Sequence, residues 1–470
     1  MPDPRPPKPP RIPIRRRALV VGVLALAGCA VAPLPPLQRD TPASWQHADR
    51  DAAPAPDLRG WWKAFGDAGL DRLVDAALAE NLGIAQAGLR IEAARMLDAH
   101  ANDAALPEFA FRTYAEPTPD SSASYFQAGF DAKWEFGLFG RAQSRARVSA
   151  GDLGIAESEQ QAARVSVVAE VVRAYVELRA AERRLALLGR IAACAQQKRE
   201  LVATRERLRL ASTRDAARAR ADEATAQAAL AEPRAEIVRA RRQLAALLGR
   251  SDENVVDDGA PLVLGETAAN AAALPADLLR TRPEIRRAQA EVVKAAGELG
   301  LAEADLYPRI GLGGALTYAA RVIGHTRLSD ADGIVTFGPA IDIPLFDWGA
   351  RRAARDARAK LLQSSALAYR QAVLDGVAEA EAAMAALHER TLAARALRDG
   401  VAALGDDARS ARALQRFGLA DGIDVAASDS ASLQAELDLL QAEQQRSLAF
   451  VALYKALGGA PLPSATGSTG

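Results

Sequence analysis

The sequence predicts a membrane protein of the α+β class, built from two similar halves and contributing four strands per chain to a shared sheet. Three observations predict it. Similar stretches recur about 200 residues apart, and four segments of about 10 residues alternate apolar with polar side chains. Two tracts, 141–210 and 350–417, contain no proline and are rich in Ala, Leu, Arg and Glu, as long helices are.

The charge balance gives no indication of a nucleic-acid partner. Among 470 residues, Lys and Arg total 59 and so do Asp and Glu. A chain without a basic excess has no general electrostatic attraction for phosphate backbones.

The N-terminus reads as a targeting segment, predicted to span residues 1–28. Arg15, Arg16 and Arg17 precede the apolar run "ALVVGVLALAG", which ends at Cys29. This order is typical of a secretory signal, and the run is about half the length that spans a bilayer. "LAGC" resembles a bacterial lipobox, which predicts lipid on Cys29 and an anchored segment over 29–60; the alternative is an ordinary signal with a chance cysteine.

The repeat divides the chain into halves at 61–250 and 276–459, with a linker at 251–275 and a flexible tail at 460–470. Three pairs of segments carry the comparison. Leu106-Pro107 matches Tyr307-Pro308, Leu138-Phe139 is paired with Leu345-Phe346, and Asp215 is paired with Asp424. Each half is expected to run helix, strand, strand, very long helix, returning helix.

The four alternating segments are predicted strands at about 108–116, 124–136, 309–319 and 333–346. A half-buried strand of a soluble sheet gives the same alternation. Four segments of this length, however, match tilted strands that cross an outer membrane. Pro339 and Pro344 predict an irregular end to the fourth.

The proline-free tracts predict helical hairpins over 141–249 and 350–458. At about 1.5 Å per residue, each long helix reaches roughly 100 Å. Val171, Leu178 and Leu185 recur every seven residues, as in a coiled-coil stripe. Pro233 predicts a kink in the first returning helix.

Four strands are too few to close a barrel, since small closed barrels need about eight. Open edges in lipid would leave backbone groups unpaired at several kcal/mol each. The strands must therefore be shared among copies. A homotrimer gives a 12-stranded barrel continuous with a 12-helix tube, whereas a dimer gives eight strands with a filled interior.

Five segments carry a resemblance to a known family: "DLRGWWKAFGDAGLDRLVDAALAEN", "LPADLLRTRPEIRRAQAEVVKA", "ADLYPRI", "IPLFDWGARRA" and "LYKALGG". In these the chain resembles TolC/OprM-type outer-membrane factors of tripartite efflux systems, particularly their lipoprotein branch. The resemblance implies a homotrimeric channel-tunnel in the outer membrane of a Gram-negative bacterium, extending into the periplasm. It implies a periplasmic adaptor and an inner-membrane RND-type pump as partners, and passive export of drugs or other small molecules. A type I protein-secretion duct and a periplasmic coiled-coil scaffold are the alternatives.

The resemblance also implies a gate at the second hairpin turn, where an apolar ring precedes an acidic ring. Ile423 takes the apolar position. The acidic position falls on Ala427, and the arginine that follows it in the family falls on Ser430. The usual charge gate is therefore not expected here in its standard form.

Asp424 and Asp429 are the nearby acids that could substitute, with Asp215 at the corresponding first turn. Three copies of an acid at a narrow axis would attract cations. The alternative is that Asp215 and Asp424 stabilise the first turns of the returning helices through the helix dipole.

Gly418 lies where a helix end favours a left-handed residue. Its counterpart is Arg209, which predicts a different first turn. Arg209, Arg214 and Gly418 are candidate adaptor contacts, and a solvated helix end is the alternative reading.

Within the second strand, Asp131, Lys133 and Glu135 are predicted to face the barrel lumen, with Trp134 and Phe136 toward lipid. Catalysis finds no support in the sequence. The four histidines are far apart, none lies in H-E-x-x-H, and there is no Walker loop or G-x-S-x-G. We therefore expect no enzyme activity, no metal and no cofactor.

Overall fold

The computed structural model describes residues 34–37, 58–101, 103–116, 125–252, 282–323 and 327–460. The predicted signal segment and Cys29 lie outside these residues, as do nearly all of the predicted linker and of the C-terminal tail. The chain divides into two compact units. The first comprises Met1–Gln38, Ile91–Ala156 and Arg287–Tyr369, and the second Arg39–Arg90, Glu157–Arg286 and Arg370–Gly470.

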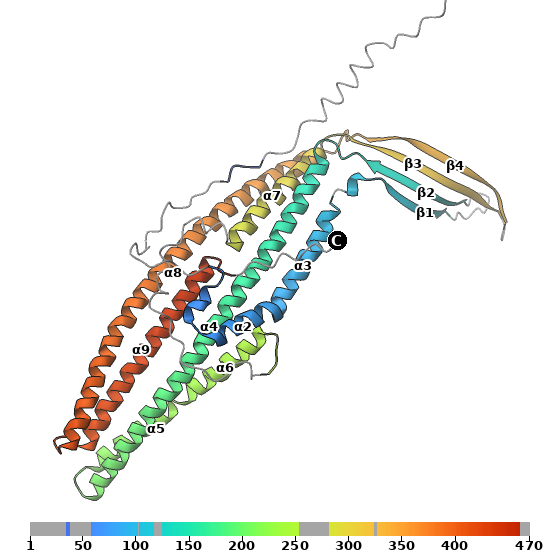
Figure 1. Cartoon of the computed structure of the whole chain (residues 1–470). Helices are drawn as coiled ribbons and strands as arrows, with labels where there is room; N and C mark the ends of the chain where they lie inside the picture. The colour runs from blue at the N-terminus through green and yellow to red at the C-terminus, as the bar shows by residue number, and fades with distance from the viewer. Residues whose placement is uncertain are drawn as a thin grey trace, which may run out of the picture. The chain divides into compact units, whose positions relative to one another are not determined.

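The first unit contains a four-stranded antiparallel sheet with the strand order β1-β2-β3-β4 (Figure 1). The strands are β1 (Glu108–Glu116), β2 (Tyr125–Glu135), β3 (Arg309–Ile323) and β4 (Arg327–Asp342). The prediction of 333–346 for the fourth strand is wrong at both ends. Its C-terminal end is set by pairing, because Asp342 lies opposite Arg309, the first residue of β3, and nothing in the described chain continues the ladder.

One face of this sheet is apolar and the other is polar. The ring of Phe111 on β1 lies 5.1 Å from that of Phe130 on β2. The register then continues this row with Leu316 on β3 and Val335 on β4. Since side chains alternate along a strand, Asp131, Lys133 and Glu135 fall on the opposite face. Large apolar side chains of the first face are exposed in the single chain, Phe337 by 80% and Phe109 by 76%.

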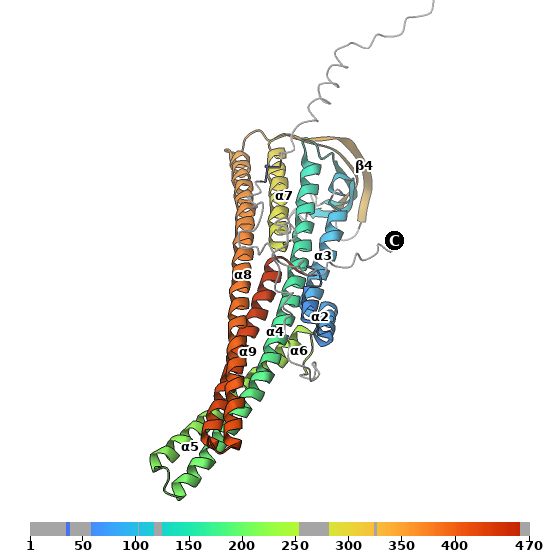
Figure 2. The ribbon, with the colours of Figure 1, turned by 60° about the vertical axis from the view of Figure 1, so that its left-hand side comes forward.

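Two helices of equal length follow the strand pairs. Helices α4 (Arg141–Arg207) and α8 (Ala350–Arg416) each contain 67 residues and contribute to both units. In the second unit, α9 (Gly422–Ala456) runs beside α8 in both views (Figure 1 and Figure 2). Within the described residues, none of the helices combines the length and the apolar character that crossing a bilayer requires.

The first returning segment is two helices, α5 (Thr213–Ala228) and α6 (Ala231–Leu247), rather than the single kinked helix that we expected. Pro233 lies in the first turn of α6. A proline has no N–H to donate and its ring clashes with the carbonyl four residues earlier. The helix therefore ends before Pro233 and begins again where a proline is tolerated.

The two halves are more similar in backbone conformation than in amino-acid sequence. Phe139 (φ 54°) and Gly140 precede α4, and Trp348 (φ 57°) and Gly349 precede α8, all with positive φ. Phe139 therefore corresponds to Trp348, a separation of 209 positions (139 to 348). The predicted pairing of Phe139 with Phe346 is two residues out, because Phe139 lies two positions before the first residue of α4 (139 to 141) and Phe346 lies four positions before the first residue of α8 (346 to 350).

The remaining elements of the described chain are shorter than α4, α8 and α9. They are η1 (Trp61–Phe65), α2 (Ala68–Glu80), α3 (Leu82–Ala99), η2 (Asp103–Ala105) and α7 (Pro283–Ala304). In the second unit, Trp61 is fully buried and its Nε1 donates to the Gly459 carbonyl at 3.0 Å. Its ring stacks on Tyr454 at 5.4 Å, so η1 is anchored to the end of α9.

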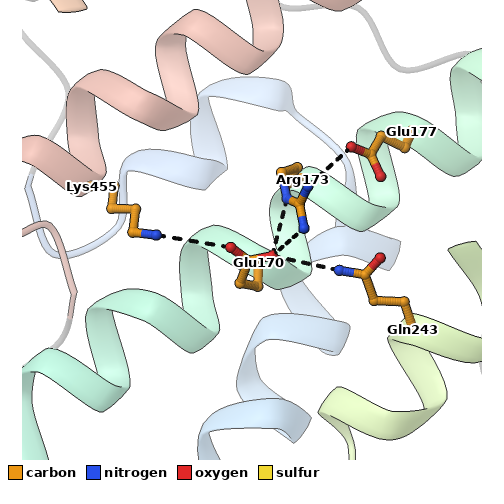
Figure 3. A network of polar contacts seen from close by, with 5 residues as sticks. All are labelled: Glu170, Arg173, Glu177, Gln243 and Lys455. Carbon is orange, nitrogen blue, oxygen red and sulfur yellow. Dashed lines mark hydrogen bonds and ion pairs between the residues drawn. The ribbon is translucent and has the colours of Figure 1, made fainter.

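A polar network joins three helices of the second unit (Figure 3). Glu170 on α4 accepts from Arg173 Nη2 at 2.5 Å and from Gln243 of α6 at 3.5 Å. Its other oxygen lies 3.9 Å from Lys455 Nζ of α9. Arg173 also lies 3.5 Å from Glu177. These contacts hold α4, α6 and α9 in one arrangement.

Candidate functional site at the hairpin turns

The two long helices end in the same left-handed turn. After α4, Arg209 has φ 60° and the N–H of Leu210 donates to the Arg205 carbonyl at 2.8 Å. After α8, Gly418 has φ 74° and Leu419 donates to Leu414 at 2.9 Å. The prediction that the first turn differs is wrong. The two hydrogen bonds of a Schellman motif close the helix end, and they hold Arg209 in a conformation that favours glycine.

Because Arg209 is strained, we expect Arg209→Gly to stabilise the chain by about 1 kcal/mol. The matched change Gly418→Ala should destabilise it by a similar amount. Thermal unfolding followed by circular dichroism measures both. If both changes shifted the unfolding temperature in the same direction and by the same amount, the correspondence of the two turns would be contradicted.

Both returning helices begin with a capping box. Ser212 caps α5 and its hydroxyl donates to the Asp215 carboxylate at 2.7 Å. Asp421 caps α9, and its N–H donates to Asp424 at 3.2 Å. The hydrogen bonds from Ser212 lower the pKa of Asp215. The local geometry thus favours the capping interpretation for Asp215 and Asp424.

An ion pair joins the two turns. Arg205, at the end of α4, donates from Nη2 to Asp421 Oδ2 at 2.7 Å, across 216 residues. This bond is the largest cause of a lowered pKa at Asp421. Sequence reasoning missed Asp421. Its correspondence to Ser212, 209 positions earlier (212 to 421), could have identified it as a cap, but not as a partner of Arg205.

The other gate candidates also have partners within the chain. Asp429 accepts from Arg412 of α8 at 2.5 Å. Ile423 packs against a small buried cluster, formed by Val202, Ala216 and Ala219 with Ala211 at its edge. Ile423 therefore contributes to the contact between the two hairpins within one chain.

Four large apolar residues at the turns are exposed, and no sequence pattern singled them out. Leu208 and Leu210 flank Arg209 and are 64% and 74% exposed. Phe417 and Leu419 flank Gly418 and are 79% and 74% exposed. Isolated exposed leucines are ordinary, but the same pair at both turns forms a repeated apolar surface, which we call the turn tips. Arg214, the second residue of α5, is exposed close to the first tip.

The candidates in the first unit lie on the polar face of the sheet. Asp131 Oδ2 is 3.4 Å from Arg112 Nε. Glu135 Oε1 is 3.3 Å from Arg141 Nε, so Glu135 lies at the junction of β2 with α4. Among the described residues, no group of His, Cys, Asp and Glu side chains has the arrangement of a metal site.

Comparisons with known proteins agree with this architecture. The family model "Outer membrane efflux protein" matches residues 73–250 and 274–459. Nodulation protein T of Rhizobium leguminosarum bv. viciae is 26% identical over 94% of this chain and 93% of its own length. Outer membrane protein OprJ of Pseudomonas aeruginosa is 29% identical over 93% of this chain and 94% of its own length.

Solved structures show the same fold. The outer-membrane channel OprN is 28% identical with a TM-score of 0.76, over 93% of this chain and 100% of the OprN chain. The open state of the Neisseria gonorrhoeae MtrE outer membrane channel is 25% identical with a TM-score of 0.77, over 92% of this chain and 98% of that one. The described architecture and these matches together establish that the chain is an outer-membrane efflux component and belongs to the outer membrane efflux protein family.

Proposed function

We propose that three copies of the chain form the outer-membrane duct of a tripartite efflux system. The observation that carries this proposal is the four-stranded sheet, which has two open edges among the described residues and one exposed apolar face. Three such sheets supply a 12-stranded barrel, whose apolar face meets lipid and whose edges are all paired. Three pairs of long helical hairpins supply a 12-helix tube. Lipid on Cys29 would anchor each copy.

The turns of the hairpins are the proposed closed end of the duct. Arg205 and Asp421 hold the two hairpins of one copy together, and Ile423 packs against the buried cluster that contains Val202. Asp424, Asp429 and Asp215 place carboxylates at or near the same turns. Asp215 and Asp424 accept hydrogen bonds within the capping boxes, and Asp429 is paired with Arg412. We therefore assign the restraint on opening to the ion pair with Asp421.

Asp131, Lys133 and Glu135 face the proposed lumen. Two of them already balance charge with Arg112 and Arg141. The wall therefore carries charges of both signs, which suits a duct for chemically diverse small molecules. Selection of the cargo then belongs to the inner-membrane pump.

The function is tested by the mass and conductance of the protein purified from outer membranes in mild detergent. A particle of three chains, lipid on Cys29 and single-channel activity in planar bilayers are expected. A water-soluble monomer without channel activity would overturn the duct and favour a periplasmic scaffold.

The turn tips are the proposed dock of the periplasmic adaptor, with Arg209, Arg214 and Gly418 at their rim. An apolar surface that is exposed at both turns is suited to burial against a partner. We expect Leu419→Glu together with Leu210→Glu to reduce cellular export at least tenfold, because each introduced carboxylate would lose its water at the contact. Conductance of the purified channel should be unchanged. The matched control is Leu404→Glu on α8, away from the turns; an equal loss of export there would argue against the dock.

A further inference from the structure

The sheet of one chain leaves two strand edges open, both in the first unit. Within the described residues, β1 pairs only with β2, and β4 only with β3. If three copies close a ring, as proposed above, β4 of one copy meets β1 of the next. The ring by itself does not determine which residues lie opposite each other.

The correspondence of the two halves supplies that register. Glu108 pairs with Lys133 in the first hairpin, and Arg309 pairs with Asp342 in the second. Arg309 lies 201 positions after Glu108 (108 to 309), and Asp342 lies 209 positions after Lys133 (133 to 342). A residue of β1 therefore corresponds to the residue of β3 that lies 201 positions later. A residue of β2 corresponds to the residue of β4 that lies 209 positions later.

One contact between the halves is already made inside the chain, between β2 and β3. It ends where the N–H of Phe136 donates to the Ile310 carbonyl at 3.1 Å. The counterpart of Phe136 is Leu345, and the counterpart of Ile310 is Phe109. We infer that β4 of each copy pairs antiparallel with β1 of the next copy, with Leu345 opposite Phe109 and Asp342 opposite Arg112.

Side-chain chemistry supports this register independently of the repeat. It sets Ile343 beside Phe111 and Leu345 beside Phe109, so the apolar face continues from one copy to the next. It also places Asp342 face to face with Arg112, whose guanidinium lies 3.4 Å from Asp131 of its own chain. Opposite charges stabilise a cross-strand pair, and the guanidinium has donors for both carboxylates. A slip of one residue would turn the apolar side chains to the polar face.

A slip of two residues keeps the faces but loses the charge pair. Asp342 would then lie opposite Ala110 or Tyr114 of the next copy. Only the inferred register matches both the faces and the charges.

The register also accounts for the residues that follow β4. In the single chain the strand ends at Asp342, but apolar residues continue at every second position to Leu345. Pairing with the next copy extends the strand to Leu345. Pro344 corresponds to Glu135, whose backbone groups point away from the β2–β3 ladder, so its missing N–H costs nothing in the new ladder. Pro339 removes one hydrogen bond from it.

The register also predicts a contact between Trp348 and the next copy. Its counterpart Phe139 stacks on Tyr307 with ring centroids 4.9 Å apart and planes at 13°. Tyr307 corresponds to Leu106. Trp348 is 90% exposed and Leu106 is 60% exposed in the single chain, and we place the Trp348 indole on Leu106 of the next copy.

Not every contact between the halves is repeated. Arg141 donates to Asp305 at 2.6 Å, and the counterpart positions are Ala350 and Ala104. The junction between copies is thus more apolar at this point than the junction within the chain.

Disulfide formation tests the register. Phe136 and Ile310 are a hydrogen-bonded pair, so Asp342 and Arg112 occupy a non-hydrogen-bonded position, with Cα atoms about 4.5 Å apart. That distance lies within reach of a disulfide. In a Cys194→Ser background, Arg112→Cys with Asp342→Cys should give covalent trimers on a non-reducing gel. The matched controls are Ala110→Cys with Asp342→Cys and Tyr114→Cys with Asp342→Cys. In the inferred register the two residues of each control pair are diagonal neighbours, about 7–8 Å apart. They should give at least about tenfold less product.

The outcomes separate this inference from the proposed function. More product from either control pair would overturn the register while leaving the trimer intact. A trimer in detergent that no pair cross-links would overturn it as well. A monomer in detergent that no pair cross-links would instead overturn the proposed trimer.

The inferred contact of Trp348 with Leu106 of the next copy is tested by the temperature at which the trimer dissociates in detergent. Trp348→Ala should lower that temperature. Phe346→Ala measures the separate contribution of the contact within the chain, since the Phe346 and Trp348 rings lie 4.6 Å apart. Phe346 corresponds to Gly137, so it has no counterpart contact on the next copy. Equal shifts of the dissociation temperature for the two variants would overturn the inferred contact of Trp348 with Leu106.

Discussion

Arg205→Ala is expected to raise the open probability of the channel by up to about a hundredfold. Both side chains of the Arg205–Asp421 pair are 42% exposed, and an exposed ion pair contributes about 0.2–1 kcal/mol. Three copies would act together in the proposed trimer, giving up to about 3 kcal/mol, and each 1.4 kcal/mol is about tenfold in an equilibrium constant. Single-channel recording at low salt measures the effect, because high salt screens an exposed pair.

The first half of the chain supplies the matched control. Asp421 is both the partner of Arg205 and the cap of α9. Its counterpart Ser212 caps α5 without an ion pair to the other hairpin. Asp421→Ser should therefore keep the cap, remove the charge and open the channel as far as Arg205→Ala does. A closed Asp421→Ser channel would show that the ion pair does not restrain the turns.

The same pair predicts a dependence on pH. The hydrogen bond from Arg205 holds the pKa of Asp421 below its ordinary value. A carboxyl group whose pKa is lowered stabilises the paired state above its ordinary pKa of about 4, and that stability is lost as the pH falls through the lowered value. We expect open probability to rise as the pH falls below about 4, and to rise less in Arg205→Ala. An equal rise in both proteins would assign the effect to other acids.

Gly297→Ala is expected to destabilise the first unit by about 1–3 kcal/mol, the usual cost of overpacking a tight contact. A Cβ on Gly297 of α7 would lie 2.7 Å from the Val148 nitrogen and 2.8 Å from the Ser144 oxygen of α4. Backbone atoms cannot move aside as a flexible side chain does. Gly151 of α4 is equally close to Lys294 of α7, so the two helices cross with their backbones in contact.

Two other glycines provide the control. At Gly189 in α4 and Gly400 in α8, a Cβ would enter open space, with no atom within 4 Å apart from the adjacent residues and the backbone of the same helix. Replacing either with alanine should stabilise the chain by about 1 kcal/mol, because alanine loses less conformational entropy in a helix. Thermal unfolding distinguishes the two kinds of site. Stabilisation by Gly297→Ala would show that α7 does not lie this close to α4.

The sequence by itself determined the family and most of the regular elements. Alternation over 108–116 and 124–136 is a local pattern and predicted β1 and β2 almost to the residue. The proline-free tracts similarly predicted two long helices, which the structure begins at Arg141 and Ala350. Hydrogen bonds within a helix and the alternation of a strand join near neighbours, so a local stretch of letters records them.

Only the tertiary structure decided which residues meet. Arg205 and Asp421 are 216 positions apart, and no local pattern connects them. The left-handed Arg209 was predicted wrongly because residue preference opposed it, while the hydrogen bonds of the turn outweighed that preference. The end of β4 at Asp342 depends on where β3 begins. In each case the deciding energy comes from a partner outside the local pattern, and that partner is known only once the chain has folded.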